Sequence, residues 1–532
     1  MCKEERGNAT RKVQLRSTDR RSDLRGVLFP HGVLLLSLPF LLNAGRFARA
    51  MTTPHPFTAG GLTLRLVKRL AFLSCSFWIA YLAIVVLSTH PCGLSPRCLS
   101  SLHLAHRPIL PESPPTETRH LVFGIASSAS SWPRRRDYVR AWWRPGETRG
   151  FVWLDRPLNS SFPQTDASLP TVRVSEDTSR FPYTYRKGLR SAIRVARIVA
   201  ETVRLGLPDV RWFVFGDDDT VFFVDNLVRV LRKYDHEMWF YVGESSENVD
   251  QNRVNSFDMG FGGGGFAISH RLAAALARVF DSCLVRYAHL YGSDARVFAC
   301  LAELGVGLTH ERGFHQVDFR GDAFGMLAAH PLAPLVTLHH LDILAPVFPK
   351  LSRLHALEHL FEAVKADSGR ILQQTICYEN SKAWTVSISW GYSVQIYNSI
   401  QLVPDLLPLL RTFMPWRRGQ KNASSVPYMF NTRELPRNPC NRPAIFFFES
   451  VLAGETGIES NYSRSSGVGC YSNKFSPWDL KYVRVLSTEL DLDTKQLQAP
   501  RRQCCDIISL TNEVMNIKIR KCEDEEVVFL ES

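Results

Sequence analysis

The sequence predicts an α/β fold for residues 119–364, because strand-like and helix-like segments alternate along this part of the chain. Apolar runs at residues 120–126 and 150–154 have the length and composition of buried strands. Between residues 183 and 205, apolar side chains recur at helical spacing. Alternation of this kind is typical of a largely parallel sheet.

The amino-terminal part has a different composition. Residues 1–69 carry 13 Lys or Arg and 4 Asp or Glu. Most of the net positive charge of the chain therefore lies in this segment, and the remainder of the chain is nearly neutral. A basic tail on a nearly neutral body argues against a nucleic-acid partner. Residues 70–87 contain no charge and follow Arg65, Lys68 and Arg69. This pattern predicts one transmembrane signal-anchor with a cytoplasmic basic tail, and a buried core helix is the alternative.

The segments on either side of the anchor have no predicted fold. Another apolar stretch, residues 27–44, contains two prolines and a glycine and is a poor helix. We therefore expect residues 1–50 to be a dispensable extension, with Met51 as the working start. Residues 88–118 are rich in proline and serine and are expected to form a stem.

Two features predict that the body lies in an oxidising, secretory compartment. Ten of the 12 cysteines follow the anchor, an even number that is compatible with disulfides, although spacing does not define the pairs. Triplets that accept N-glycosylation begin at Asn159, Asn422 and Asn461. Reduced core cysteines and unmodified asparagines are the alternative.

The remaining elements follow in chain order. The first strand ends in a run of small residues that begins with Ser127 and Ser128, as expected where a strand enters a loop. Gly206 ends the predicted helix 183–205. From about residue 365 the alternation stops, and strand-like stretches are separated by loops, so residues 365–532 are expected to be a β-rich, cysteine-containing extension. The other predicted elements are a helix at 134–143 and strands at 171–174, 211–215, 220–224, 385–390 and 444–448.

Three consecutive carboxylates, Asp217, Asp218 and Asp219, follow the aromatic strand 211–215. Strand-like residues resume at once, so the triplet lies in a tight junction. Ligands gather at the carboxyl ends of strands in such sheets, and adjacent carboxylates repel unless a cation compensates them. The pattern predicts a site for Mg²⁺ or Mn²⁺, with a solvated turn or a helix N-cap as the alternative.

The glycine run 262–265 permits a close approach of the backbone to a sugar or phosphate, since bulky side chains would block it. The same run also fits a weak G-x-G-x-x-A dinucleotide pattern. The sequence contains neither the acidic strand end that this pattern requires nor a P-loop signature.

The segment WFVFGDDDTVFF resembles the metal-binding element of GT-A nucleotide-sugar glycosyltransferases. Further motifs resemble the fringe-like, plant fringe-related branch of the β-1,3-glycosyltransferase family. They are YVGE at 241–244, GFGGGGFAIS at 260–269, YGSD at 291–294, LGV at 304–306, FHQ at 314–316 and HHLD at 339–342. The resemblance covers roughly residues 119–345 and implies a GT-A-type mixed sheet flanked by helices.

The resemblance also implies roles for single residues. Asp219 and His340 would bind the metal ion, with His339 as the alternative because HHLD can be aligned with a slip of one residue. Asp294 would be the catalytic base that deprotonates the acceptor hydroxyl. It also suits an N-cap of the helix 295–304, and both roles are compatible.

The donor nucleotide would contact six residues near these strand ends, with Arg136 and Tyr138 as further helpers and Trp142 and Trp143 in the core. The six are Ser127, Ser128, Asp217, Asp218, Gly263 and Gly264.

The resemblance thus implies a type II membrane protein of the Golgi that transfers a sugar from a UDP-sugar to a glycan or glycoprotein hydroxyl with inversion. Mn²⁺ or Mg²⁺ would be the cofactor. A noncatalytic lumenal module that binds a carbohydrate or cation on the same fold is the alternative. A metal-dependent phosphodiester hydrolase would need ligands for a second metal, and we identify no convincing set.

Overall fold

The computed structural model describes most of the chain beyond residue 113 and one helix before it. The predicted extension 1–50 and most of the predicted stem 88–118 lie outside the described residues. The chain divides into two compact units, residues 1–110 and residues 111–532. The described ranges are 61–89, 114–159, 166–417, 426–455, 457–465 and 475–528.

The first unit contains α1 (Gly61–Thr89), a helix of 29 residues that includes the predicted anchor 70–87. Its side chains are described for residues 69–85, where large apolar groups are exposed. Among the described residues, no helix combines the length and the apolar composition that a membrane crossing requires.

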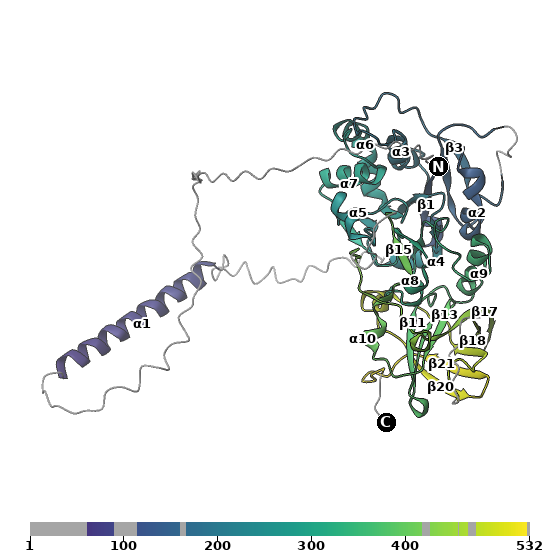
Figure 1. The fold of residues 1–532 in the computed structure, drawn as a ribbon. Coiled ribbons are helices and arrows are strands. Elements are labelled where there is room, and N and C mark those ends of the chain that lie inside the picture. Colours follow the sequence, from purple (N-terminus) through teal and green to yellow (C-terminus); the bar gives the residue numbers. More distant parts are fainter. Residues whose placement is uncertain are drawn as a thin grey trace, which may run out of the picture. The chain divides into compact units, whose positions relative to one another are not determined.

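The second unit is built on a seven-stranded sheet with the order β3-β2-β1-β4-β7-β6-β8 (Figure 1). Strands β1, β2, β3 and β4 pair in parallel, whereas β7 is antiparallel to both β4 and β6. The parallel pairing predicted from the sequence is confirmed for these four strands, but the sheet as a whole is mixed. The strands are β1 (Leu121–Ala126), β2 (Arg149–Leu154), β3 (Thr171–Val174), β4 (Trp212–Asp217), β6 (Tyr241–Gly243), β7 (Phe266–Ser269) and β8 (Leu308–His310).

Helices pack on both faces of this sheet, because successive side chains of a strand point to opposite faces. In β4, Phe213 and Phe215 pack with α3, α6 and α7, whereas Trp212 and Val214 belong to the core that includes α2 and α9. The helices of this half are α2 (Trp132–Trp142), α3 (Ser191–Val203), α4 (Val224–Leu231), α5 (Val249–Val254), α6 (His270–Arg286), α7 (Ser293–Glu303), α8 (Phe324–Ala328) and α9 (Arg353–Ala366).

Two predicted elements are shorter than expected. Helix α3 begins at Ser191 rather than at residue 183, because the preceding segment is held in a non-helical path by tertiary contacts. Arg190 donates hydrogen bonds to three backbone carbonyls at residues 178–181, just before this segment, and Thr184 donates its backbone N–H to the carbonyl of Ala288. The strand predicted at 220–224 is only β5 (Val221–Phe222), since α4 begins at Val224.

Strand β5 pairs with β10 (Thr337–Leu338) in antiparallel fashion. This short pairing matters for the site, because β5 directly follows the acidic triplet and β10 directly precedes the HHLD segment. The two motifs are more than 100 residues apart in the sequence, and the β5–β10 pair brings them to the same place.

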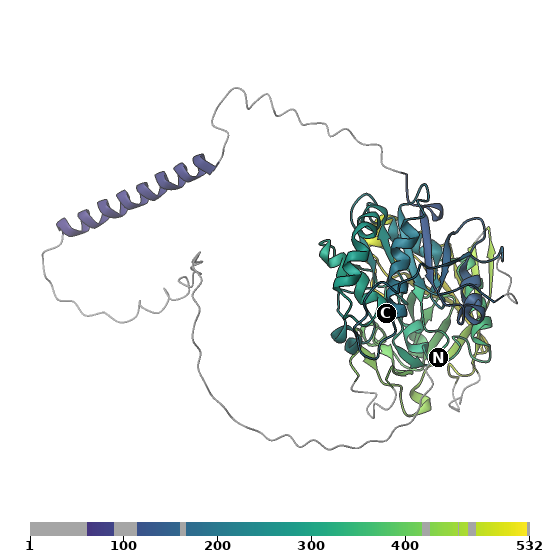
Figure 2. The same ribbon diagram turned by 90° about the horizontal axis from the view of Figure 1, so that it is seen from above.

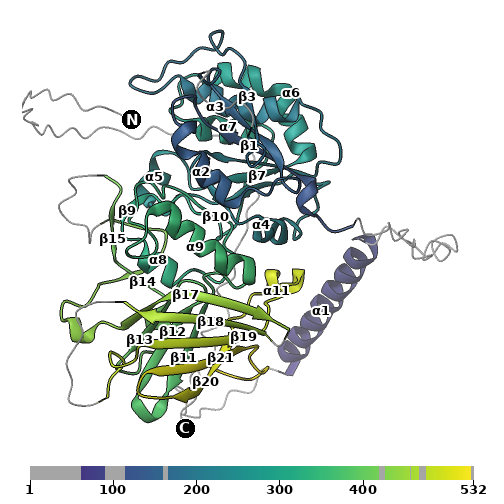
Figure 3. The ribbon, with the colours of Figure 1, turned by 90° about the vertical axis from the view of Figure 1, so that its right-hand side faces the viewer.

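The carboxyl-terminal region forms a second sheet of eight strands, in the order β11-β12-β13-β17-β18-β19-β21-β20. In Figure 3 this sheet lies below the first one, with α8 and α9 between the two, and in Figure 2, seen from above, it lies mostly behind the first. Its strands are β11 (Gln374–Glu379), β12 (Trp384–Ser389), β13 (Ser393–Tyr397), β17 (Ala444–Gly454), β18 (Gly457–Arg464), β19 (Tyr482–Ser487), β20 (Cys504–Leu510) and β21 (Val514–Arg520).

Smaller elements and disulfides complete this unit. Short strand pairs join β9 to β15 and β14 to β16. Disulfides link Cys283 to Cys300, Cys377 to Cys505 and Cys504 to Cys522. The smaller elements are β9 (Phe319–Gly321), β14 (Leu409–Leu410), β15 (Phe413–Pro415), β16 (Thr432–Arg433), α10 (Val403–Leu406), α11 (Thr494–Gln498) and the 3₁₀ turns Thr118–His120, Asn380–Lys382 and Pro439–Asn441.

One hydrophobic core extends across both sheets. Phe324 of α8 lies 6.0 Å from the ring of Tyr392 and 5.9 Å from that of Phe447, both in or next to strands of the second sheet. Phe223 stacks on Phe361 of α9 with 5.4 Å between ring centroids. The predicted boundary near residue 365 therefore coincides with the end of α9 but lies within one core.

The shared core predicts that both sheets unfold together. Phe324→Ala should lower the free energy of unfolding by about 3–5 kcal/mol, because it leaves a cavity between the sheets. Leu452→Ala, at a side chain that is 67% exposed, should change it by less than about 0.5 kcal/mol. Denaturant titrations followed by fluorescence and by circular dichroism would show one shared transition. Two transitions, with only one moved by Phe324→Ala, would contradict the shared core.

Candidate active site

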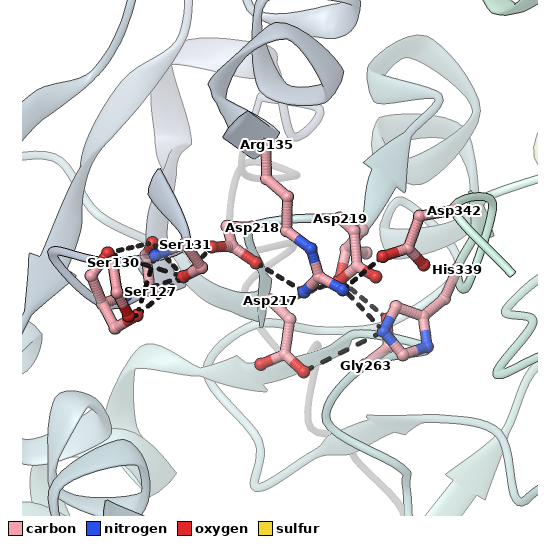
Figure 4. A network of polar contacts seen from close by, with 12 residues as sticks. Ser127, Ser130, Ser131, Arg135, Asp217, Asp218, Asp219, Gly263, His339 and Asp342 are labelled. Carbon is pink, nitrogen blue, oxygen red and sulfur yellow. Dashed lines mark hydrogen bonds and ion pairs between the residues drawn. The ribbon is translucent and has the colours of Figure 1, made fainter. Parts of the chain in front are cut away.

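The acidic triplet lies at the end of the central strand β4 and is held by a tight turn. Thr220 Oγ1 accepts a hydrogen bond from the backbone N–H of Asp217 and donates one to the carbonyl of Gly263, each at 2.7 Å. The turn is thereby tied to the glycine run. Its three carboxylates point toward different partners (Figure 4), so each has a different chemical environment.

Asp218 is buried and anchors the loop between β1 and α2. It accepts hydrogen bonds from the hydroxyls of Ser127 and Ser131, each at 2.7 Å, and from Arg135 at 3.0 Å. The hydroxyl of Ser128 lies 2.8 Å from that of Ser131. Of the predicted donor contacts, Asp218 and Ser127 are thus engaged with each other, and their role visible in the structure is to position this loop.

Asp219 is almost completely buried, with 1% of the residue exposed. Neither of its carboxylate oxygens has a hydrogen-bond donor among the described residues. Two positive groups lie close by: Arg135 at 3.2 Å and Nε2 of His339 at 3.3 Å from Oδ1. Burial alone would raise the pKa of Asp219, but these two groups hold it below its usual value.

His339 is oriented from its far side. Its Nδ1 donates to the backbone carbonyl of Gln316 at 3.2 Å, which turns Nε2 toward the carboxylates. If the ring becomes neutral, as a metal ligand must, this bond keeps the remaining proton on Nδ1. Nε2 also lies 3.9 Å from Oδ2 of Asp217. Burial alone would lower the pKa of His339, but the adjacent carboxylates, Asp219 above all, raise it to about 9.

The structure favours His339 over His340 as the residue that faces the acidic triplet. Its backbone adopts a positive φ of 56°, and its ring stacks on Trp416 with 4.5 Å between centroids. Its Nδ1 lies 3.3 Å from the carbonyl of Val317. His339, the alternative alignment, therefore faces the acidic triplet, and His340 packs behind it.

The glycines of the run leave room for the site. A Cβ on Gly263 would lie 2.1 Å from Cε1 of His339, so a side chain here would displace the imidazole. Gly264 donates its backbone N–H to Oε1 of Gln316 at 2.6 Å. Both glycines thus position His339 in this structure, Gly263 by the space it leaves and Gly264 through Gln316.

Asp294, in the first turn of α7, lies near Asp217. Both residues line one small cavity between α3, α7 and the sheet. Ser293 Oγ donates to Oδ1 of Asp294 at 2.8 Å. Loss of surrounding water raises the pKa of both carboxyl groups, that of Asp217 to about 7, where the negative charges of Asp219 and Asp294 add to the effect.

The alternative of an N-cap does not hold for Asp294. Helix α7 begins at Ser293 with Gly292 as its N-cap residue, so Asp294 lies in the first turn. A carboxylate there interacts favourably with the helix dipole without being the cap.

Sequence reasoning missed Arg135 and Asp342. Arg135 pairs with Asp218 and Asp219 and also with Asp342 at 2.5 Å. In the run of three arginines at 134–136, helical phase alone does not indicate which one reaches the triplet. Tyr138 is half-buried, and Trp142 and Trp143 are buried, as predicted for these two tryptophans.

The residues present fit a divalent cation. Asp217, Asp219 and His339 each offer one ligand atom, and these atoms all lie within 4.8 Å of one another. The donor set is two carboxylates and one imidazole, which suits Mn²⁺ or Mg²⁺ in the presence of further oxygen ligands. The hydrogen bond at Nδ1 of His339 is the outer contact typical of a histidine ligand.

The raised pKa of His339 predicts a pH dependence in the absence of metal. A basic group whose pKa is higher in the folded state stabilises the protein fully below its unfolded value of 6.5, and this contribution is lost as the pH rises through about 9. His339→Gln should therefore destabilise the protein by roughly 3 kcal/mol more at pH 6 than at pH 10. Unfolding titrations in EDTA would measure this, and an equal cost at both pH values would refute the coupling.

Gly263→Ala should separate His339 from the carboxylates. In this variant we expect the pKa of His339 to fall from about 9 toward 6.5, because the added Cβ occupies the position of the imidazole ring. NMR titration of labelled histidine in EDTA would follow this. Gly307→Ala, where an added Cβ meets nothing within 4 Å, is the matched control and should leave the titration unchanged.

Comparison with known families agrees with these motifs. A family model described as Fringe-like matches residues 172–321, and one described as Protein of unknown function, DUF604, matches residues 251–505. The first range contains the acidic triplet, and the second contains His339 and most of the second sheet. No curated protein sequence matches the chain significantly. Together the two matches cover residues 172–505 and support a fringe-like glycosyltransferase family for this chain.

Proposed function

We propose that the protein transfers the sugar of a UDP-sugar to a hydroxyl group of a glycan or glycoprotein, with inversion at the anomeric carbon and with a divalent cation. The observation that carries this proposal is the environment of Asp219. A buried carboxylate without a hydrogen-bond donor faces Nε2 of His339, and a separate carboxylate with a raised pKa, Asp294, lies near Asp217.

Asp219, His339 and Asp217 would hold the cation. When bound, Mn²⁺ or Mg²⁺ would supply positive charge for the diphosphate that leaves the sugar. Arg135 adds a fixed positive charge at 3.2 Å from Asp219. The protein groups thus gather both signs of charge where a nucleotide diphosphate would need them.

Asp294 would accept the proton of the acceptor hydroxyl as that oxygen attacks the anomeric carbon. The hydrogen bond from Ser293 to Oδ1 orients the carboxylate. Its raised pKa brings it closer to neutral pH, where a carboxylate is a more effective base. An added Cβ at Gly262 would lie 2.7 Å from Oδ1 of Asp294, so this glycine leaves the space in front of the carboxylate open.

We further propose that the protein is a single-pass type II protein of the Golgi membrane, anchored by residues 70–87. The uncharged run and the preceding basic residues support this topology, and the disulfides found among the described residues suit an oxidising lumen. Protease digestion of sealed microsomes tests it. A carboxyl-terminal tag that is degraded without detergent would contradict the lumenal assignment.

Release of UDP tests the activity itself. The full chain, solubilised in detergent, would be incubated with Mn²⁺ and a panel of UDP-sugars, with and without simple glycoside acceptors. We expect UDP release from at least one donor, and its loss in Asp219→Ala. Binding of donor without any release would instead favour a noncatalytic lumenal module on the same fold.

Asp294→Asn should lower turnover by about 10²–10⁴-fold, because the amide cannot accept the proton. UDP binding in the presence of Mn²⁺, measured by calorimetry, should remain nearly unchanged. Asp258→Asn, at an exposed side chain, is the matched control and should keep full turnover. An equal loss of donor binding in Asp294→Asn would show that the residue has a different role.

A further inference from the structure

A larger cavity lies on the side of the second sheet, apart from the acidic triplet. Its volume is about 470 Å³, and none of the candidate active-site residues lines it. Its walls come from both halves of the unit. Residues 233–234, 310–312 and 332–334 form one wall, and residues 373–375, 490–503 and 521–522 contribute to the other.

The lining of this cavity carries a surplus of positive charge. Lys233 pairs with Glu311, the single carboxylate of the lining, which also accepts a hydrogen bond from Tyr234. Four more cations line the cavity, and none of them forms an ion pair with a carboxylate among the described residues. They are Arg312, Arg501, Arg502 and Lys521.

Arg502 is the most informative of these cations. It donates hydrogen bonds to the backbone carbonyl of Gln374 at 2.6 Å and to its Oε1 at 3.1 Å, both of which are neutral acceptors. Burial lowers the pKa of Arg502, so its charge has lost water without gaining a counter-charge. Such an arrangement is costly, and an anion in the cavity would offset the cost.

The acidic run that follows Cys522 does not neutralise the cavity lining. None of residues 523–526 lines it, and Glu526 pairs with Arg520. Arg501 donates hydrogen bonds to the backbone carbonyls of Glu523 and Glu526, and its charge also helps to lower the pKa of Glu526. The positive surplus of the cavity therefore rests on Arg312, Arg502 and Lys521.

Two disulfides hold the cation-bearing segments in place. Cys504 and Cys505 are adjacent, and they bond to Cys522 and Cys377 respectively. These bonds tie together the chain around Arg502, the end that carries Lys521 and the strand β11 that carries Gln374. A site whose charged groups are fixed in advance loses less entropy when a ligand binds.

The uncharged side chains of the lining indicate which kind of molecule would carry the anionic group. Amide side chains suit sugar hydroxyls, and apolar side chains suit the faces of a sugar ring. The volume also lies in the usual range for a small-molecule site. The amides are Gln373, Gln496 and Gln503, and the apolar groups include Leu332, Leu490 and Leu492.

We propose that this cavity binds an anionic sugar, whose carboxylate or phosphate contacts Arg312, Arg502 and Lys521. The site is separate from the proposed catalytic centre, and its main cations lie in the carboxyl-terminal sheet region. The second sheet thereby gains a role in binding in addition to its part in the shared core.

Calorimetric titration of the full chain in detergent tests this proposal. The probes are D-glucuronate, glucose 6-phosphate, glucose and inorganic sulfate. We expect one or both acidic sugars to bind at least tenfold more tightly than glucose and sulfate. Glucuronate alone would identify a uronate site, and glucose 6-phosphate alone a sugar-phosphate site. Sulfate binding as tight as that of the acidic sugars, or no binding by either acidic sugar, would overturn the proposal.

Variants test whether the acidic sugar binds in this cavity. The double variant Arg312→Gln with Lys521→Gln, at exposed side chains, should weaken the affinity for the acidic sugar by about tenfold or more. The matched control is Arg278→Gln with Lys518→Gln, which removes the same charge from exposed positions outside the cavity. Asp219→Ala should bind the acidic sugar like the parent, which separates this site from the donor site. Equal weakening in both double variants would refute the assignment to the cavity.

Discussion

Burying a carboxylate that has no hydrogen-bond donor is costly unless positive charge lies close to it. Asp219 is such a carboxylate. Arg135 from α2 and His339 from the segment after β10 supply that charge. Each is held in turn: Arg135 by Asp342, and His339 by the carbonyl of Gln316. The elements around β4 can therefore be understood as supports for one buried negative charge.

The short β5–β10 pairing carries much of this geometry. It fixes the HHLD segment beside the turn that follows β4, although the two are far apart in the sequence. The glycine run then completes the arrangement, because Gly263 leaves the volume that the His339 ring occupies. Small local features of the backbone thus decide which side chains meet, while the large sheet supplies a stable base for them.

The fold class, the acidic turn and the position of Asp294 near that turn could be predicted because each depends on a local pattern: a strand, a junction of carboxylates or a family motif. The choice between His339 and His340 could not, because it depends on a positive φ at one residue and on the space beside Gly263. Arg135 is hidden among three consecutive arginines. The start of α3 is not legible from helical spacing, because Thr184 bonds to the distant Ala288 and Arg190 bonds to the chain before residue 183.

Phe324 and its aromatic neighbours join the two sheets across one continuous interior. A gene fragment that ended near residue 365 would leave these rings facing solvent, and such a surface favours aggregation over folding. In this chain neither sheet can be exchanged alone without a matching partner face. The half that carries the acidic triplet therefore depends on the carboxyl-terminal sheet to cover its apolar side chains.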